Sequence, residues 1–243
     1  MKPEEYEIMY RVEDRHWWYV GLRGMIQDFW GRHVTQGRPN ALDVGCGTGA
    51  VLSAFAHQAD ATGIDMSLEA IRFCRGRGHT RLAAASAVGL PFAPEGFDVV
   101  MMFDVLCHRN IVDKKAPLRE IHRILKPQGI LLMNLPAYQW LHSSHDVAVH
   151  SDHRFTKRAA VRLLKECSFD VIEATYWNTL PFPPILLVRL WRKIAPPRAS
   201  DLGGGASVLA SRFLRGILAI ERHLIRLRPM PFGLSIFLAA RKA

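Results

Sequence analysis

Leu42-Asp43-Val44-Gly45-Cys46-Gly47-Thr48-Gly49 is the stretch that decides the fold of this 243-residue chain. A short apolar run ends in three glycines at alternate positions, and a helix-like segment begins near Ala50. Glycine lets the backbone turn tightly and approach a ligand closely, and the first N–H groups of a helix stay available to that ligand. The stretch therefore predicts a strand, a ligand-binding turn of the nucleotide type and a helix.

A carboxylate follows the next apolar run, in Gly63-Ile64-Asp65-Met66-Ser67. A glycine turn alone is weak evidence, because tight turns in any α/β protein use glycine. An acidic residue at the tip of the neighbouring strand can accept hydrogen bonds from both hydroxyls of a ribose. Together the two features favour a nucleotide-type site over simple turn chemistry.

Short apolar runs alternate with helix-like segments through most of the chain. We predict strands at residues 41–44, 61–64, 97–103, 129–135 and 169–175, and a closing strand at 234–240. Helices are predicted at about residues 49–58, 67–76, 115–125 and 156–167. This alternation is typical of an α/β fold with a mostly parallel sheet and helices on both faces.

The length of the chain suits a single domain with additions to a standard core. We predict an N-terminal helical cap over residues 1–38, with one long helix at about 4–34, and a cofactor-binding core over 39–178. A basic amphipathic helical insertion follows over 179–230, and the closing strand lies within 231–243.

The spacing of the glycines separates two kinds of nucleotide site. The dinucleotide fingerprint G-x-G-x-x-G/A fits only if Ala50 is taken as the third small residue, which disfavours a nicotinamide oxidoreductase. The segment from Asp43 to Gly49 instead matches D-x-G-x-G-x-G without adjustment. Here the chain resembles the class I S-adenosylmethionine-dependent methyltransferases, in particular the group that includes ubiquinone and menaquinone biosynthesis enzymes.

The resemblance covers about residues 40–178 and continues through three further motifs: Gly89-Leu90-Pro91-Phe92, Asp104-Val105-Leu106-Cys107-His108 and the segment 120–129. It implies a Rossmann-like, doubly wound, mostly parallel seven-stranded sheet. It also implies an N-terminal helical lid, and the chain adds a helical insertion before the last strand.

S-adenosylmethionine is the cofactor that the resemblance implies. In this family the glycine turn faces the methionine part, the acidic residue after the second strand faces the ribose, and the loop after the third strand faces the adenine. The residues expected to contact the cofactor are Asp43, Gly45, Cys46, Gly47, Gly49, Asp65, Met66, Ser86, Ala87, Phe103, Asp104, His108 and Trp17. The chain departs from the family at Ala85-Ser86-Ala87, where an acidic residue commonly receives the adenine amino group.

Methyl transfer from a sulfonium needs an aligned nucleophile and, for a hydroxyl acceptor, a group that removes its proton. His108 follows the fourth strand, and His145, Asp146 and His153 follow the fifth. We expect His145 to act as base and Asp146 to orient it, with His108 and His153 as further candidates. The alternative is that these residues cap helices and order a surface loop. Histidines in a loop without a matching pair of carboxylates do not predict a metal site.

Positive charge is concentrated in the insertion. The formal net charge is +10, and residues 181–230 contain nine Lys or Arg against two acidic residues. A helix predicted at about 206–228 aligns Arg212, Arg215, Arg222 and Arg226 on one face, with apolar side chains over much of the rest. Such a helix can cap the site, lie on an anionic membrane, or simply present a solvated face above a core stripe.

The apolar wall of the insertion favours a small, apolar or lipid-like acceptor, methylated on oxygen or carbon. RNA is disfavoured because no exposed aromatics are interleaved with the basic residues. A catalytically silent cofactor-binding scaffold is the alternative outside the enzymes. Scattered cysteines, no signal peptide and no membrane-spanning run predict a cytoplasmic protein, with peripheral contact at the inner face of the membrane as an option.

Overall fold

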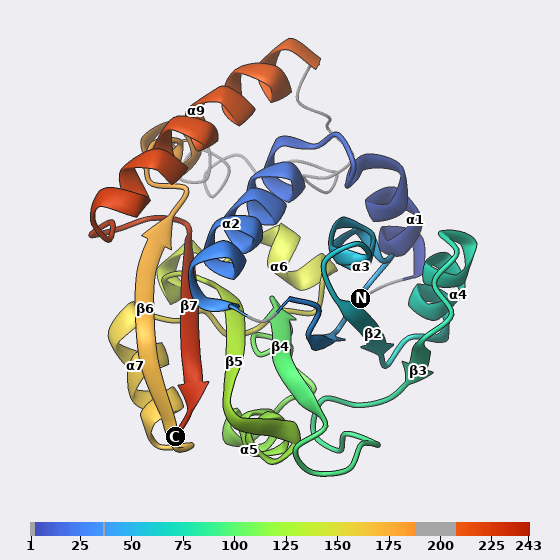
Figure 1. Ribbon diagram of the computed structural model, residues 1–243. Helices are drawn as coiled ribbons and strands as arrows, with labels where there is room; N and C mark the ends of the chain where they lie inside the picture. The colour runs from blue at the N-terminus through green and yellow to red at the C-terminus, as the bar shows by residue number, and fades with distance from the viewer. Residues whose placement is uncertain (1–2, 36, 188–207) are drawn as a thin grey trace.

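The computed structural model describes residues 3–35, 37–187 and 208–243 (Figure 1). Its strands are β1 (Asn40–Val44), β2 (Asp60–Asp65), β3 (Leu82–Ala84), β4 (Phe97–Phe103), β5 (Leu125–Pro136), β6 (Phe169–Trp177) and β7 (Ser235–Lys242). They form one seven-stranded sheet in the order β3-β2-β1-β4-β5-β7-β6. Only β7 runs antiparallel to its neighbours among these described strands. The predicted α/β fold with a mostly parallel sheet is confirmed.

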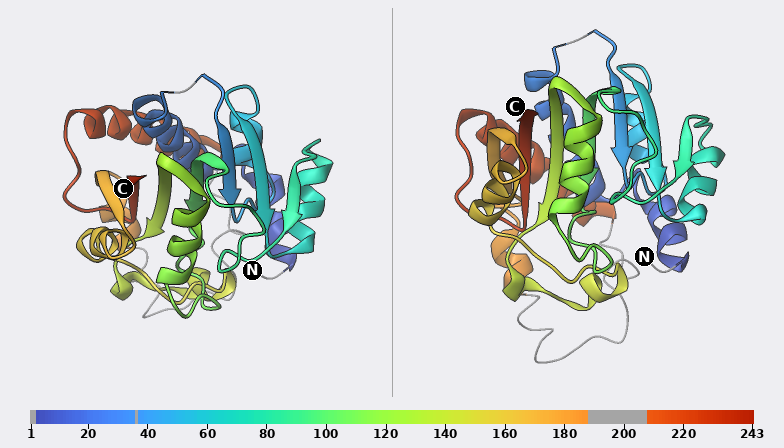
Figure 2. Two further views of the ribbon diagram at one scale, coloured as in Figure 1. Left: turned by 60° about the horizontal axis from the view of Figure 1, so that its bottom comes forward. Right: turned by 90° about the horizontal axis from the view of Figure 1, so that it is seen from below.

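Helices cover both faces of the sheet (Figure 2). They are α1 (Pro3–Val12), α2 (Trp17–His33), α3 (Ala50–Phe55), α4 (Leu68–Gly76), α5 (Lys115–Ile124), α6 (Ser144–Ala148), α7 (Lys157–Lys165) and α9 (Val208–Leu227), with a short 3-10 helix at Gln139–Leu141. The helices α2 and α9 pack together on one face, and α5 and α7 lie on the other. Burial on both faces explains why the central strands are continuous apolar runs in the sequence.

The N-terminal segment forms two helices, so the predicted single helix over about 4–34 is wrong. The polar residues 13–16 separate α1 from α2, and the N–H groups of Arg15 and His16 both bond to the Val12 carbonyl. His16 then caps α2, since its Nδ1 accepts a hydrogen bond from the Trp18 N–H at 3.4 Å. The apolar positions expected to face the core, such as Met25, Ile26 and Phe29, are buried.

The strand β3 has no counterpart among the predicted segments. It is three residues long and partly exposed, and Leu-Ala-Ala contains neither a β-branched nor an aromatic side chain. Pairing makes it a strand, because Leu82 to Ala84 align with Gly63 to Asp65 of β2.

The carboxyl ends of β1, β2 and β4 lie side by side. Val44 pairs with Ile64 in β2 and with Met102 in β4. The strand order reverses between β1 and β4, because β2 and β3 continue on one side and β5 on the other. Open α/β sheets bind ligands at such a reversal. The topology therefore places the ligand site where the glycine turn leaves β1.

Candidate functional site

The glycine turn forms a cradle at the end of β1. Gly45, Gly47 and Gly49 have φ values of 78°, 54° and 91°, in the left-handed region that favours glycine. The N–H groups of Gly45 and Cys46 bond to the Ile64 carbonyl at 2.8 and 2.9 Å, which fixes the turn against β2. The Cys46 side chain is buried, with its Sγ 3.7 Å from that of Cys74 in α4. Cys46 thus offers only its backbone to the cradle.

Asp65 joins the cradle to its neighbours. Its carboxylate accepts hydrogen bonds from the N–H groups of Gly47 at 3.1 Å and Ser67 at 2.9 Å. Its carbonyl accepts from the Ala85 N–H at 3.1 Å, so the loop after β3 lies beside it. The structure thereby brings together Asp65, the glycine turn and the loop with Ser86 and Ala87, as the sequence predicts. Met66 differs, because its side chain is 61% exposed.

Asp43 is a buried carboxylate beneath the cradle. It is 2% exposed, and its Oδ2 has no hydrogen-bond partner among the described residues. Burial, together with the negative charges of Asp65 and Glu13, raises the pKa of Asp43 to about 7. An unpartnered carboxylate oxygen beside two other acidic groups favours a ligand that carries positive charge.

A chain of hydrogen-bonded polar groups lies at the end of β4, with Asp104 partly buried and Asn134 and Trp177 buried. Both carboxylate oxygens of Asp104 accept from the Asn134 amide at 2.9 Å, and the Trp177 indole donates to the Asn134 oxygen at 2.7 Å. Burial raises the pKa of Asp104 to about 7. Asn134 and Trp177 are not among the predicted site residues. A polar residue within the apolar run 129–135 was the signal for Asn134.

Comparison with known proteins places this site in a family. Residues 42–133 match the family model described as a methyltransferase domain. This part of the chain is a class I methyltransferase domain. It contains the glycine turn, Asp65 and Asp104, which are the parts of the site described so far.

Relatives of the methyltransferase domain include enzymes with different acceptors. An O-methyltransferase of Penicillium expansum is 30% identical over 140 residues, covering 54% of this chain and 47% of the relative. A ubiquinone/menaquinone biosynthesis C-methyltransferase of a Shewanella species is 30% identical over 141 residues, covering 50% and 55%. The chain spans about half the length of these relatives.

Solved structures share the fold. A methyltransferase from Mesorhizobium loti is 17% identical with a TM-score of 0.59, covering 94% of this chain and 99% of that one. The [4+2]-cyclase SpnF is 21% identical with the same TM-score of 0.59, covering 90% and 80%. At these identities the likeness concerns the fold alone, and one fold carries more than one activity.

The helix α1, which precedes the methyltransferase domain in the chain, lies directly over the glycine cradle. The Tyr6 side chain is 7% exposed, and its burial, together with the negative charge of the nearby Asp65, raises the pKa of the Tyr6 hydroxyl to about 12. A Cβ at Gly47 would lie 2.7 Å from the Met9 Cε. The Thr48 hydroxyl donates to the buried Glu13, whose carboxylate also pairs with Arg77 at 2.7 Å. Tyr6, Met9 and Arg77 are site residues that the sequence does not indicate.

The cradle is covered by α1 and by Glu13, which follows this helix and accepts a hydrogen bond from Thr48 of the turn. Trp17 begins α2 and is partly buried, with its ring centre 5.6 Å from that of His16. The predicted contact of Trp17 with a cofactor stays a prediction. Phe103 packs on Phe237 of β7, with ring centres 5.8 Å apart, so its ring belongs to the core.

The predicted catalytic histidines have different surroundings. Burial lowers the pKa of His108 to about 4, and the neighbouring His150, 5.8 Å away between ring centres, adds to that effect. Burial also lowers the pKa of His153, whose ring packs on Phe155 at 4.5 Å. Both imidazoles are therefore neutral at pH 7. The side chain of His145, which belongs to α6, lies outside the described residues.

Asp146 forms a buried ion pair, and its predicted role in orienting His145 stays a prediction. Its carboxylate is buried and pairs with Arg154 at 2.8 Å, and it accepts hydrogen bonds from the N–H and hydroxyl of Ser143. Although burial alone would raise the pKa of Asp146, Arg154 and the Ser143 N–H hold it below its ordinary value. These contacts tie α6 to the chain that precedes α7, and the alternative of an ordered surface loop expects contacts of this kind.

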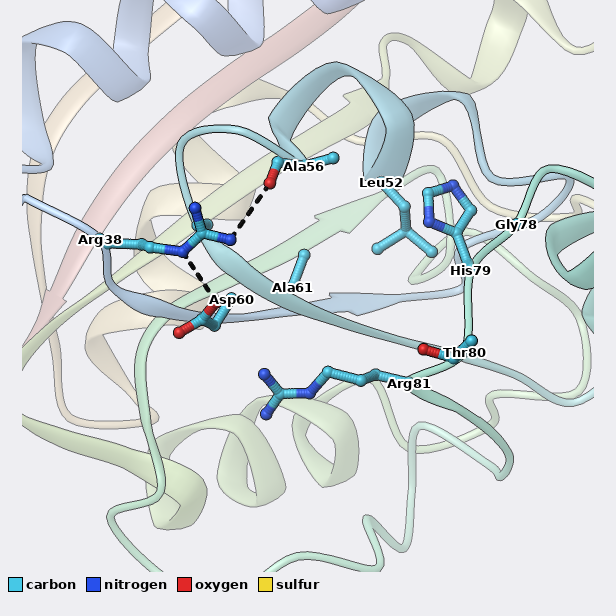
Figure 3. Close-up of a pocket in the computed structure, with 10 residues that line it drawn as sticks. Arg38, Leu52, Ala56, Asp60, Ala61, Gly78, His79, Thr80 and Arg81 are labelled. Atoms are coloured by element: carbon cyan, nitrogen blue, oxygen red, sulfur yellow. Dashed lines mark hydrogen bonds and ion pairs between the residues drawn. The ribbon is translucent and has the colours of Figure 1, made fainter.

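A surface hollow of about 180 Å³ lies outside this site (Figure 3). It is lined by α3, the start of β2 and the residues before β3, including Arg38, Asp60 and His79. Arg38 is held there by Asp60 at 2.9 Å. Arg38 and Asp60 lie at the amino ends of β1 and β2, whereas His79 lies beside the cradle, because a Cβ at Gly49 would come 3.2 Å from the His79 Cδ2. In the described part of the chain no group of three or more His, Cys, Asp or Glu residues could hold a metal ion.

Proposed function

We propose that the chain transfers the methyl group of S-adenosylmethionine to a small, apolar or lipid-like acceptor. The observation that carries the proposal is the unpartnered carboxylate oxygen of Asp43 beneath the glycine cradle. The cofactor carries an ammonium and a sulfonium, and buried acidic groups complement such a cation. Asp65 supplies the carboxylate that a ribose requires beside the same turn.

Each part of the cradle has a task in this proposal. The turn from Gly45 to Gly49 and Asp43 hold the methionine part, Asp65 holds the ribose, and Ser86 and Ala87 border the adenine. When bound, the cofactor supplies an electrophilic methyl group. The residues of this chain orient it, exclude water and accept the proton of the acceptor.

Two groups near the end of β4 suit proton transfer at neutral pH. Asp104, with a pKa of about 7, is partly in its basic form there. His108 is neutral and able to accept a proton. A base works best when its pKa lies near the working pH, which favours Asp104 over His108. His145 and His153 stay candidates from the sequence.

The cover formed by α1 favours a second candidate function, a protein that binds no cofactor. Tyr6 and Met9 lie against Asp65 and Gly47, where the cofactor would lie. If α1 keeps this position, the chain is a catalytically silent scaffold with a methyltransferase fold.

Calorimetric titration separates the two candidates. The purified chain is titrated with S-adenosylmethionine, and with NAD⁺ as the control nucleotide. Micromolar binding of S-adenosylmethionine alone supports the proposal, and transfer of labelled methyl to apolar hydroxylated compounds then tests the acceptor class. Absence of binding to both nucleotides supports the silent scaffold, and binding of NAD⁺ alone contradicts both.

A further inference from the structure

The inner face of α9 is fully engaged by the rest of the protein. Gly21 and Gly24 of α2 let it approach, because a Cβ at either position would overlap Leu218 or the Arg222 guanidinium. Asp28 of α2 pairs with Arg222 at 2.7 Å and with Arg226 at 2.5 Å. The predicted basic face is thus in part an internal contact. Four further basic residues of the predicted insertion, Arg189, Arg192, Lys193 and Arg198, lie outside the described residues.

A buried acidic residue fixes α9 to the end of β6. Glu221 is 1% exposed, and its carboxylate accepts the N–H groups of Thr179 at 3.0 Å and Leu180 at 2.9 Å. These residues follow Trp177, whose indole reaches the Asn134 and Asp104 pair described above. In Figure 1 α9 lies beyond α2, on the side to which β6 points. The helix is thereby held near the carboxyl end of the sheet, which is the end that carries the site.

The outer face of α9 carries a stripe of exposed apolar side chains. Its members fall at separations of seven, four and three, so they share one side of the helix. They are Phe213, Ile220, Leu224 and Leu227, with exposed fractions of 70, 61, 37 and 73%. Exposed apolar stripes of this kind mark interaction surfaces.

Positive charges border the stripe, and negative charges are absent from it. Arg212 and Arg228 are exposed, and the Arg226 side chain is 54% exposed despite its pairing with Asp28. The described helix α9 contains one acidic residue, Glu221, and that residue is buried. An apolar stripe with basic borders on a surface helix is the pattern of helices that lie in the interface of an anionic membrane.

We propose that α9 docks the protein on the surface of an anionic phospholipid bilayer. The stripe enters the interface, and Arg212 and Arg228 meet lipid phosphates. A second copy fits this face less well, because pairing two α9 helices would bring their arginines together. Among the described residues no helix is long and apolar enough to cross a membrane, so docking means lying on the surface.

Vesicle flotation tests this docking without any turnover, so its outcome is independent of the proposed methyl transfer. The full chain is mixed with phosphatidylcholine vesicles, with and without phosphatidylglycerol. We expect flotation only with the anionic vesicles. Replacing the stripe by Phe213→Ser, Ile220→Ser and Leu227→Ser lowers binding on the order of 100-fold. Arg212→Gln with Arg228→Gln lowers it on the order of tenfold.

The matched control lies on α4, which is at the lateral edge of the sheet opposite to β6. Leu68 is 65% exposed and the Arg72 side chain 74% exposed, so Leu68→Ser with Arg72→Gln removes the same kinds of group elsewhere. This control is expected to float like the unaltered chain. Far-UV circular dichroism of each variant verifies its fold. Absence of flotation of the unaltered chain overturns the proposal, as does equal flotation of the stripe variant. A dimer in solution that the stripe variant abolishes, without vesicle binding, assigns the face to a second copy instead.

Discussion

Asp65 is the residue at which cofactor binding is most directly testable. Its carboxylate receives the Gly47 and Ser67 N–H groups, and in the proposed function it also receives the ribose hydroxyls. Asp65→Asn removes the charge while keeping the shape. Hydrogen bonds to a charged group contribute about 1.5 to 3 kcal/mol, so we expect affinity for S-adenosylmethionine to fall roughly 10- to 100-fold by calorimetry.

Asp60 provides the control on the same strand. It lies at the amino end of β2 and pairs with Arg38 at the surface. Asp60→Asn is expected to leave the affinity unchanged. If both variants bind S-adenosylmethionine like the unaltered chain, Asp65 does not contact the cofactor.

Asp43 makes stability depend on pH. Its pKa is raised from 3.8 to about 7, so the folded protein binds this proton more tightly than the unfolded chain does. The resulting stabilisation is fully present below about pH 4 and is lost as the pH rises to about 7. Over this window Asp43 lowers the free energy of unfolding by about 1 kcal/mol per pH unit as the pH rises.

Urea unfolding of Asp43→Asn at several pH values measures this contribution. We expect the variant to show a shallower fall in the free energy of unfolding between pH 5 and 7, because one of the carboxyls whose pKa is raised by burial is gone. Asp104 retains its own share of the slope. An unchanged slope in the variant would show that Asp43 titrates normally.

At the residue scale, the sequence predicted those features of the site that depend on residues close together in the chain. Gly45, Gly47 and Asp65 were recognisable because turn conformation and strand ends can be read locally. The bond between Asn134 and Trp177 joins residues 43 positions apart, and it forms only because β7 brings β5 and β6 together. The Arg154 partner of Asp146 was similarly hidden, since nothing in the sequence shows that the loop folds back on itself.

The helix α1 is the element whose position most affects the proposed site. The Tyr6 hydroxyl lies near the Asp65 carboxylate that a ribose would use, since burial and the charge of Asp65 both raise its pKa. Tyr6→Phe removes this hydroxyl while keeping the ring. The carboxylate is then left to the ribose, and because a hydrogen bond to a charged group contributes about 1.5 kcal/mol, we expect affinity for S-adenosylmethionine to rise roughly tenfold.

Calorimetry of Tyr6→Phe beside Tyr10→Phe makes this comparison specific. Tyr10 lies on the same helix, but its ring packs on Phe73 of α4 and under the Arg77 guanidinium. Removing the Tyr10 hydroxyl is expected to leave the affinity unchanged. A weaker affinity in Tyr6→Phe would mean that Tyr6 assists the cofactor, and α1 would then be a lid that closes on it.

Two elements show where helix and strand patterns mislead. Apolar side chains continue at helical spacing on both sides of residues 13–16, so the periodicity alone does not reveal the break between α1 and α2. The break follows from the cap that His16 provides. The strand β3 is the opposite case. Its sequence does not favour a strand, and its pairing with β2 decides the structure.

For the whole molecule, the fold class was predictable and the cover of the site was not. Alternating strands and helices restrict a parallel sheet to few topologies. The predicted closing strand corresponds to β7, which lies between β5 and β6 although a long segment separates it from β6 in the chain. The placement of α1 over the cradle depends on contacts with α4 and with Arg77, which no local pattern announces. The role of the net charge could not be predicted either, because it depends on which basic side chains the folded protein leaves exposed.

Cofactor binding should stabilise the whole molecule against heat. A ligand at about 100 times its dissociation constant adds about 2.7 kcal/mol to the free energy of unfolding, and a chain of this length gains about 2 to 4 °C per kcal/mol. We therefore expect S-adenosylmethionine to raise the melting temperature by about 5 to 10 °C in a thermal scan, whereas NAD⁺ leaves it unchanged. The same cofactor concentration should shift Asp65→Asn much less, because the ligand occupies less of that variant. A shift of equal size in both proteins would place the stabilising contact away from Asp65, and no shift in either would mean that α1 keeps the cradle closed to the cofactor.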